Sequence, residues 1–363
     1  MLNVSQWQDR AVFLTGHTGF KGSWLALWLA GMGARVYGYA LDPSTTPSLF
    51  AEAGVAHQLA GDTRADIADR AALQAALQAA QPSVVLHLAA QALVRPGYAD
   101  PVGTFATNVM GTVHLLEAVR SVESVQAVVI VTTDKVYDNR EWVYPYRESD
   151  ALGGHDPYSA SKSAAETVVA SYRASFYGAA RHAARVATAR AGNVIGGGDW
   201  APERLVPDCL QAFAAGAPVC LRYPQAVRPW QHVLEPLGGY LVLAERLLST
   251  EGGVAAKAWN FGPEAGGDAT VGTVAEALAR RWGGSARVEC PVVGKIPHEA
   301  GLLRLDITQA RIELGWRPRW SIGQALDATV DWYTDWQRGG NAAMLCREQI
   351  STYTSGTMME PLR

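Results

Sequence analysis

The sequence predicts an α/β fold in which a doubly wound parallel sheet is followed by a smaller C-terminal lobe. Through the first half of the 363-residue chain, short apolar runs alternate with helical patterns, which is typical of parallel βαβ units. A glycine-rich segment follows the first apolar run directly, as expected where a strand turns into a helix. After Gly192 the chain becomes rich in Gly, Pro, Trp and Arg and its periodicity weakens, which indicates the second lobe.

Each expected strand is a short apolar run that is next to a helical pattern. The expected strands cover residues 11–14, 35–39, 84–88, 127–131 and 185–190. The expected helices between them cover residues 19–31, 70–80, 105–119 and 157–176. Asp156, with Pro157 behind it, is the expected N-cap of the last of these helices.

The change of texture divides the chain into two predicted domains. Residues 1–191 are expected to form the first domain, which residues 234–257 rejoin through a helix at 237–248. Residues 192–233 and 258–345 are expected to form the smaller lobe, with helices at 271–282 and 322–336. The chain has little pattern from residue 339 onward, so we expect a loose tail at 346–363.

Composition excludes several classes of protein. With 48% hydrophobic and 18% charged residues, the chain can bury a sizeable core and is not a disordered protein. The net charge of -3 gives no electrostatic reason to expect nucleic acid or a membrane surface as partner. The four cysteines are far apart and lack zinc-like spacing, so we expect free thiols and no metal site. Since no secretory signal or spanning apolar run of ~20 residues is visible, we expect a cytoplasmic protein.

The first glycine-rich segment is a candidate dinucleotide site. It reads Gly16-His17-Thr18-Gly19-Phe20-Lys21-Gly22. Its glycines allow a tight turn and close approach to a pyrophosphate at a helix N-terminus. His17 is bulky for this position, which gives two hypotheses: a cradle that holds its cofactor loosely, or a side chain that points to solvent.

Other positions predict which dinucleotide binds. Asp42 lies 20 residues beyond Gly22, where a carboxylate can accept the ribose hydroxyls. No arginine occurs between residues 36 and 60 to neutralise a 2′-phosphate, so NAD is favoured over NADP. Small side chains end the strand at 84–88, as needed where backbone passes a cofactor, although packing alone also explains them: Leu88, Ala89, Ala90 and Gln91.

A tyrosine and a lysine form the candidate catalytic pair. Tyr158 and Lys162 lie one turn apart on the same face of the expected helix 157–176. An ammonium group nearby favours the phenolate, so the tyrosine can remove a hydroxyl proton while hydride leaves the same carbon. Such a pair is common by chance and gains its weight from the glycine motif upstream.

Together, the G-x-x-G-x-x-G segment and the Tyr158/Lys162 pair resemble the extended short-chain dehydrogenase/reductase family, which has a Rossmann-like fold and binds NAD. The stretch Thr133-Asp134-Lys135 resembles the nucleotide-sugar 4,6-dehydratases, in which Thr-Asp-Glu is the common form. With the run from Gly192 to Trp200, the similarity covers residues 7 to 336 and implies the branch whose substrate is CDP-glucose.

The resemblance implies a reaction. Tyr158 and NAD oxidise carbon 4 of the sugar while Thr133 holds its hydroxyl and Lys162 tunes the phenol. Asp134 protonates the hydroxyl that leaves carbon 6, and hydride then returns to carbon 6. Lys135 replaces the usual Glu, which leaves two roles open. A base needs a pKa far below the ordinary lysine value of about 10.4, whereas a cation would stabilise the developing enolate.

The resemblance also implies roles for residues outside the catalytic stretch. Asp66 and Ile67 would contact the adenine, and Asn108 would support the active site. The nucleotide-sugar diphosphate would contact Asn193 and Arg228, the latter by a forked guanidinium. Weaker candidates line the nucleotide pocket: Arg204, Leu205 and Arg222. Family members pair as dimers through the helices that match 105–119 and 157–176, which implies a homodimer or a dimer of dimers.

Two other functions remain open at this point. A nucleotide-sugar 4-epimerase would share the glycines, Tyr158 and Lys162 but needs no acid at Asp134. A non-catalytic dinucleotide sensor would need only the glycine segment, and the intact tyrosine–lysine pair argues against it.

Overall fold

The computed structural model describes residues 2–178, 182–290 and 300–356. Its centre is a seven-stranded sheet in which every neighbouring pair of strands is parallel. The strands are, in spatial order, β11 (Ala258–Phe261), β6 (Arg185–Ala191), β5 (Ala127–Val131), β4 (Val84–His87), β1 (Ala11–Thr15), β2 (Arg35–Ala40) and β3 (Gly61–Arg64). The predicted α/β, Rossmann-like fold is therefore confirmed.

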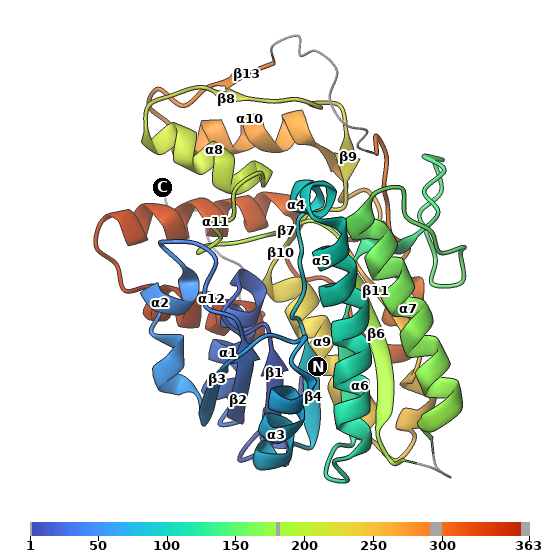
Figure 1. Cartoon of the computed structure of the whole chain (residues 1–363). Helices are drawn as coiled ribbons and strands as arrows, with labels where there is room; N and C mark the ends of the chain where they lie inside the picture. The colour runs from blue at the N-terminus through green and yellow to red at the C-terminus, as the bar shows by residue number, and fades with distance from the viewer. Residues whose placement is uncertain (1, 179–181, 291–299, 357–363) are drawn as a thin grey trace.

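Helices cover both faces of this sheet (Figure 1). One face packs against α3 (Arg70–Ala80), α6 (Gly111–Arg120) and α7 (Pro157–Phe176). The other packs against α1 (Phe20–Gly31) and α9 (Leu234–Leu248). Val12 and Leu14 of β1 face the α1 layer, whereas Phe13 between them faces the α3 layer. Strands buried on both faces become continuous apolar runs, which is why the sequence pattern revealed them.

Two of the predicted helices show instructive detail. Asp156 caps α7 as predicted, and its carboxylate accepts the Ser159 amide at 3.0 Å in a reciprocal capping box. The single helix predicted at 105–119 is instead α5 (Pro101–Phe105), a π-helical turn (Ala106–Met110) and α6. Further short elements are α2 (Leu49–Glu52), α4 (Val94–Ala99) and 3-10 turns at Val4–Gln6, Val55–Gln58, Asp134–Val136 and Gly252–Ala255.

A smaller lobe lies over the carboxyl ends of the strands (Figure 1). Its helices are α8 (Leu205–Ala214), α10 (Val271–Trp282) and α11 (Ile322–Gln337). Its two-stranded pairs are β7 (Val194–Ile195) with β10 (Gln231–His232), β8 (Val219–Cys220) with β13 (Val288–Glu289), and β9 (Val227–Arg228) with β12 (Ala269–Thr270). A further π-helical turn covers Ala310–Leu314.

The return to the first domain is longer than the sequence indicated. Helix α9 packs against β5 and β6, and β11 then pairs with β6 at the edge of the main sheet. Residues 258–261 therefore belong to the sheet and not to the smaller lobe, whose second part was predicted to start at residue 258. This strand was missed because its four residues are too short to give a periodic signal.

The prediction of a loose tail at 346–363 was wrong for residues 346–355, which are helical. Residues 357–363 lie outside the described residues. The chain forms α12 (Ala342–Ser355), which packs against α1 and α11. The buried side of this helix repeats at a helical period but includes a polar residue, which hid the pattern from the sequence: Ala342, Cys346, Gln349 and Tyr353.

A buried carboxylate connects α9 to α12. Both oxygens of Glu235 lie 3.0 Å from the Arg319 amide nitrogen, and the Trp320 amide and the Tyr353 hydroxyl donate at 2.7 and 2.8 Å. Glu235 is fully buried. Burial raises the pKa of Glu235 from 4.5 to about 7, although these hydrogen bonds oppose the rise. The C-terminal helix is therefore held by a group that titrates near neutral pH.

We expect Glu235 to give the free energy of unfolding a distinct pH dependence. Between about pH 4.5 and about pH 7 the folded state binds more protons at this site than the unfolded chain, so stability falls as pH rises through this range. The full shift corresponds to about 3 kcal/mol. Urea unfolding at several pH values should therefore show a smaller decline for Glu235→Gln than for the native chain. Equal declines in the two proteins would contradict this role.

Among the described residues, no helix has the length and apolar character needed to cross a membrane.

Candidate active site

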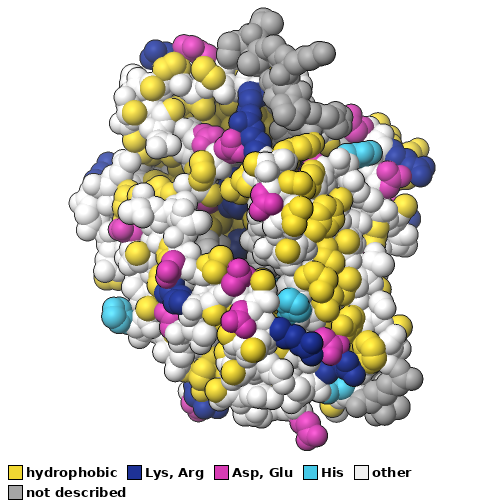
Figure 2. Space-filling model, in the orientation of Figure 1, with side chains coloured by type: hydrophobic (Ala, Val, Ile, Leu, Met, Phe, Trp, Pro, Cys, Tyr) yellow, Lys and Arg dark blue, Asp and Glu magenta, His cyan; other side chains and the backbone are white. Residues whose placement is uncertain are grey.

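A cavity of about 670 Å³ lies at the carboxyl ends of the strands, between the sheet and the smaller lobe. Figure 2 shows the molecule hollowed between these two parts, with Lys and Arg side chains along the hollow. Parallel strands deliver their carboxyl ends to one edge of a sheet, so residues distant in sequence meet there. Most of the predicted site residues line this cavity: Gly16, Thr18, Gly19, Phe20, Lys21, Gly22, Asp42, Asp66, Ile67, Leu88, Ala89, Ala90, Thr133, Asp134, Lys135, Tyr158, Lys162, Asn193, Arg204, Leu205, Arg222 and Arg228.

The glycine segment is a tight turn from β1 into α1. Gly16 has a φ of +77°, and a Cβ on it would lie 2.6 Å from the Ala89 nitrogen. A Cβ on Gly22 would lie 2.0 Å from the Gly16 oxygen, which is backbone and cannot move aside. Both positions therefore require glycine. The first residues of the 12-residue helix α1 line the cavity, and a helix N-terminus at this place suits a pyrophosphate.

His17 and Gln91 do not line the cavity. The His17 ring is fully buried beneath the turn, where Nε2 lies 2.8 Å from Asp62 Oδ1 and the ring edge meets Phe50. Gly38 makes room for it, since a Cβ there would lie 2.6 Å from the ring. The side chain thus neither points to solvent nor enters the cradle, so a loose fit has no basis in its size.

Gln91 instead braces the loop that follows β4. Its amide nitrogen donates to Thr104 at 2.9 Å, and its oxygen accepts the Leu93 amide at 2.6 Å. Asn108 brackets the Gln91 backbone, accepting its N–H and donating to its carbonyl, each at 2.9 Å. The same amide also donates to Ser161 of α7 at 2.9 Å. Gln91 and Asn108 therefore shape the wall of the cavity from behind.

The edge of the cavity at β2 and β3 carries an arginine that the sequence argument missed. Arg64 pairs with Asp42 at 3.2 Å and with Asp62 at 2.8 Å. It lies beyond residues 36–60, but the register of β2 with β3 brings it opposite Ala40. Two carboxylates balance this guanidinium, so Asp42 remains the exposed acceptor at this edge.

The stretch after β5 places a buried acid inside the cavity. Asp134 is 2% exposed, and Thr133 Oγ1 donates to its Oδ1 at 3.0 Å. Among the described residues, Oδ2 has no hydrogen-bond partner. Burial raises the pKa of Asp134, and the neighbouring Lys135 and Thr133 oppose the rise. This environment favours the protonated carboxyl that an acid catalyst needs.

The candidate base and its lysine lie on α7. Burial raises the pKa of the Tyr158 phenol to about 12, while the hydrogen bond with Thr133 lowers it. Burial lowers the pKa of Lys162 to about 8, and Glu166 opposes this shift. Lys162 Nζ donates to the Val131 carbonyl at 3.1 Å, at the end of β5. At neutral pH the pair is thus a neutral phenol close to a mostly protonated amine.

Lys21 brings a second amine to the cavity wall. Its Nζ donates to the Tyr240 hydroxyl at 2.8 Å. Burial lowers the pKa of Lys21 to about 7, and repulsion from Lys162 and Arg204 adds to this effect. Because lysine is rarely placed in apolar surroundings, its position within the turn is a distinctive feature of this cavity.

The smaller lobe supplies the remaining basic groups. Arg228 lies on β9 and is 3% exposed, and Arg204, which precedes α8, pairs with Asp199 at 2.9 Å. Arg95 of α4 pairs with Glu203 at 2.8 Å, which joins the two walls of the cavity. No spacing in the sequence indicated this last contact, because it joins a short helix to a loop.

Comparison with known proteins identifies the family of this chain. The family model described as GDP-mannose 4,6 dehydratase matches residues 13–329. The CDP-glucose 4,6-dehydratase of Salmonella typhimurium is 48% identical over 360 residues, which cover 98% of this chain and 99% of that protein. The dTDP-glucose 4,6-dehydratase of Streptomyces griseus is 31% identical over 336 residues, 89% of this chain and 93% of that protein.

Solved structures agree on the fold. The dTDP-glucose 4,6-dehydratase of Streptomyces venezuelae, solved with NAD and TYD bound, matches with a TM-score of 0.74 and 25% identity, covering 92% of this chain and 99% of that one. The UDP-glucose 4-epimerase of Thermotoga maritima matches with a TM-score of 0.76 at 21% identity, covering 90% and 99%, and shows the fold alone. Because the family model covers most of the chain and the Salmonella relative nearly all of it, this chain belongs to the nucleotide-sugar 4,6-dehydratase family.

Proposed function

We propose that this chain is an NAD-dependent hydro-lyase that converts CDP-glucose to CDP-4-keto-6-deoxyglucose. The observation that carries the proposal is the buried carboxyl of Asp134, which lies with Thr133 and Tyr158 in one cavity. A 4-epimerase needs the tyrosine and lysine but no acid at this position. The 48% identity to a CDP-glucose 4,6-dehydratase supports the same choice.

The residues present fit NAD. The turn formed by Gly16 and Gly22 leaves space that a Cβ would fill, and Asp42 offers acceptors at the far edge. Asp66 and Ile67 line the wall next to β3, where an adenine would lie. Bound there, NAD would supply the group that accepts hydride from carbon 4 and, once reduced, returns hydride to carbon 6.

The side chains divide the reaction between them. Thr133 holds the hydroxyl on carbon 4, and Tyr158 takes its proton as hydride leaves. The resulting ketone acidifies the hydrogen on carbon 5. A base takes this hydrogen as a proton, either Lys135 itself or, if Lys135 acts as the stabilising cation, another group of the cavity. Asp134 donates its proton to the hydroxyl on carbon 6, which leaves as water, and a proton returns to carbon 5 as hydride adds to carbon 6. Tyr158 acts as a base in its phenolate form, which the positive charge of Lys162 favours although burial raises the pKa of the phenol.

The nucleotide end of the substrate belongs against the smaller lobe. The sugar occupies the middle of the cavity, so the diphosphate and base extend past Asn193 toward Arg204, Arg222 and Arg228, which line that wall. Guanidinium groups bind phosphate by forked hydrogen bonds. The assignment of cytosine as the base rests on the identity to the Salmonella enzyme.

The protein is proposed to act as a homodimer. Large apolar side chains are exposed together on α4, α5 and the following π-helical turn: Tyr98, Val102, Phe105 and Met110. Figure 2 shows hydrophobic side chains gathered on this side of the hollow. Exposed apolar area of this kind favours association with a second copy. A cytoplasmic location stays a prediction, which the free thiols of all four cysteines accommodate.

The activity is tested by incubating the purified protein with NAD and a panel of nucleotide-glucoses. We expect a 4-keto sugar that carries a new methyl group at carbon 6, formed fastest from CDP-glucose and without net NADH. An epimeric sugar with no methyl group would instead identify a 4-epimerase. Binding of NAD with no turnover of any sugar would identify a dinucleotide sensor.

Replacing Lys135 tests whether this side chain takes part in dehydration. We expect Lys135→Met to retain oxidation at carbon 4 but to slow dehydration by about 10²-fold, since both roles left open for Lys135, base and stabilising cation, act where the enolate forms. The measurement is deuterium wash-in at carbon 5 beside product formation. Full turnover with normal wash-in would remove Lys135 from the mechanism.

A further inference from the structure

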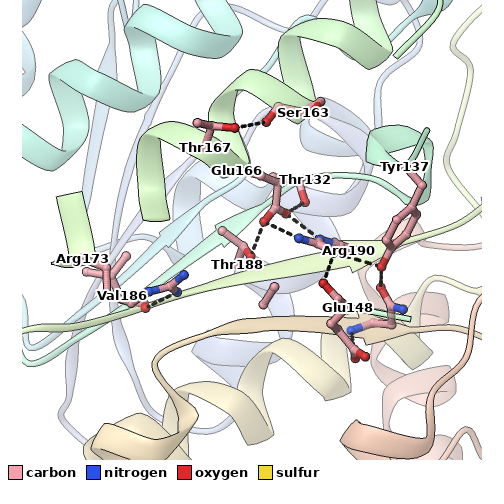
Figure 3. A network of polar contacts seen from close by, with 12 residues as sticks. Thr132, Tyr137, Glu148, Ser163, Glu166, Thr167, Arg173, Val186, Thr188 and Arg190 are labelled. Carbon is pink, nitrogen blue, oxygen red and sulfur yellow. Dashed lines mark hydrogen bonds and ion pairs between the residues drawn. The ribbon is translucent and has the colours of Figure 1, made fainter. Parts of the chain in front are cut away.

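A buried polar network joins α7 to the ends of β5 and β6 just beneath the cavity (Figure 3). At its centre the Glu166 carboxylate is 4% exposed. Thr132 Oγ1 donates to Oε1 at 2.6 Å, and Thr188 Oγ1 donates to Oε2 at 2.7 Å. Arg190, 3% exposed, donates to both oxygens at 3.0 and 2.9 Å.

The position of Glu166 links the two halves of the catalytic site. It lies one helical turn beyond Lys162 on α7, the helix that also carries Tyr158. Thr132 directly precedes Thr133 and Asp134 at the end of β5. One carboxylate oxygen thus connects the helix that carries the base to the strand end that carries the acid.

Stability alone does not account for this ion pair. Removing two charges from water is expensive, and buried pairs often contribute little compared with apolar side chains of similar size. In addition, each of the two threonine hydroxyls donates a hydrogen bond to one oxygen of the Glu166 carboxylate, which fixes the direction of that carboxylate. A fully satisfied network of this kind specifies one arrangement of the elements that it joins.

We propose that Glu166 is a positioning residue of the dehydratase, which through Thr132 fixes Tyr158 and Lys162 relative to Thr133 and Asp134. Arg190 keeps the carboxylate ionised and is itself held by the Tyr137 hydroxyl at 3.0 Å. Thr188 holds the second oxygen from β6, which carries none of the catalytic groups. This proposal rests on the proposed function, because the rate of the dehydratase reaction is what tests it.

The charge of Glu166 supports the same role. Burial acts to raise its pKa, but Arg190 and the two threonine hydroxyls outweigh this effect and lower it. The anion in turn favours the protonated form of Lys162, on which burial acts in the opposite direction. The charge of Lys162 in turn adds to burial in lowering the pKa of its neighbours Lys21 and His87.

The two threonines provide a matched pair for the test. Thr132→Val and Thr188→Val each remove one hydroxyl bonded to the same carboxylate, at nearly equal distances and with both side chains buried. We expect Thr132→Val to lower kcat by about tenfold or more with little change in KM, because displacement of a catalytic group costs rate and not binding. Thr188→Val should keep kcat within about twofold of the native value, and Thr132→Ser should restore most of the loss.

The readouts separate positioning from general destabilisation. Both valine variants should unfold at similar temperatures, and the pH profile of the oxidation step should shift only in Thr132→Val. Equal kcat values in the two variants, whether native or reduced, would overturn the proposal. Thr132→Ala repeats the comparison if Thr132→Val does not fold. Native protein that does not turn over CDP-glucose would count against the proposed function and not against this inference.

Discussion

Tyr158→Phe is expected to lower kcat for conversion of CDP-glucose by about 10²- to 10⁴-fold, the contribution typical of a positioned general base. The phenol is buried beside Thr133, one helical turn before Lys162 on α7. Removing its hydroxyl leaves the proton of the carbon 4 hydroxyl without an acceptor, so hydride transfer should stop with it. The measurement is the rate of NADH appearance in a single turnover, together with the rate of product formation.

Binding provides the control for this variant. A phenylalanine ring in place of Tyr158 would occupy the same buried space, so affinity for NAD and for CDP-glucose should change little in calorimetric titration. Native rates of NADH appearance in Tyr158→Phe would remove the phenol from the oxidation step. Lys21, a buried amine of the cavity with a pKa of about 7, would then be the next candidate for the base.

The sequence could predict most of the cavity because of one property of parallel sheets. Gly16, Thr133 and Tyr158 are far apart along the chain, but each follows directly after, or packs against, the carboxyl end of a strand. Short apolar strands buried on both faces are easy to recognise, and their ends then place the residues that follow. The cradle and the tyrosine–lysine pair were therefore predicted from local patterns, whereas the acid role of Asp134 was implied by the resemblance to the 4,6-dehydratases.

The sequence could not predict which way a side chain turns. His17 occupies the turn as predicted, but its ring packs under the loop because Gly38 on the neighbouring strand leaves room there. Arg64 was missed because it is distant from Asp42 in the sequence, and only the pairing of β2 with β3 brings the two side chains together. Both facts depend on pairing between strands, which leaves no local signal.

Glu166 lies between these two cases. Its spacing of four residues from Lys162 puts both on one face of α7, and this period is visible in the sequence. Its partners lie just after β5 (Thr132) and on β6 (Thr188 and Arg190). The buried network itself could therefore be found only in three dimensions (Figure 3).

Asp134→Asn should separate oxidation from dehydration. The amide keeps the shape of the carboxyl and can still accept from Thr133, which now lies 3.0 Å from Oδ1, but it cannot donate a proton to the hydroxyl on carbon 6. We therefore expect dehydration to slow by about 10²- to 10⁴-fold while the first oxidation continues. After rapid mixing with CDP-glucose, NADH should accumulate in Asp134→Asn, whereas in the native enzyme it should appear only transiently.

The pH dependence of the native enzyme gives an independent check on Asp134. Burial raises the pKa of this carboxyl, so the protonated form persists to higher pH than for an ordinary aspartic acid. Dehydration should fall as pH rises through that raised pKa, because the acid form is lost, and this limb should be absent in Asp134→Asn. Oxidation should not share the limb, since Tyr158 and not Asp134 takes the proton in that step. If the variant kept both the native rate of dehydration and the native pH limb, the proton would have to come from another group of the cavity.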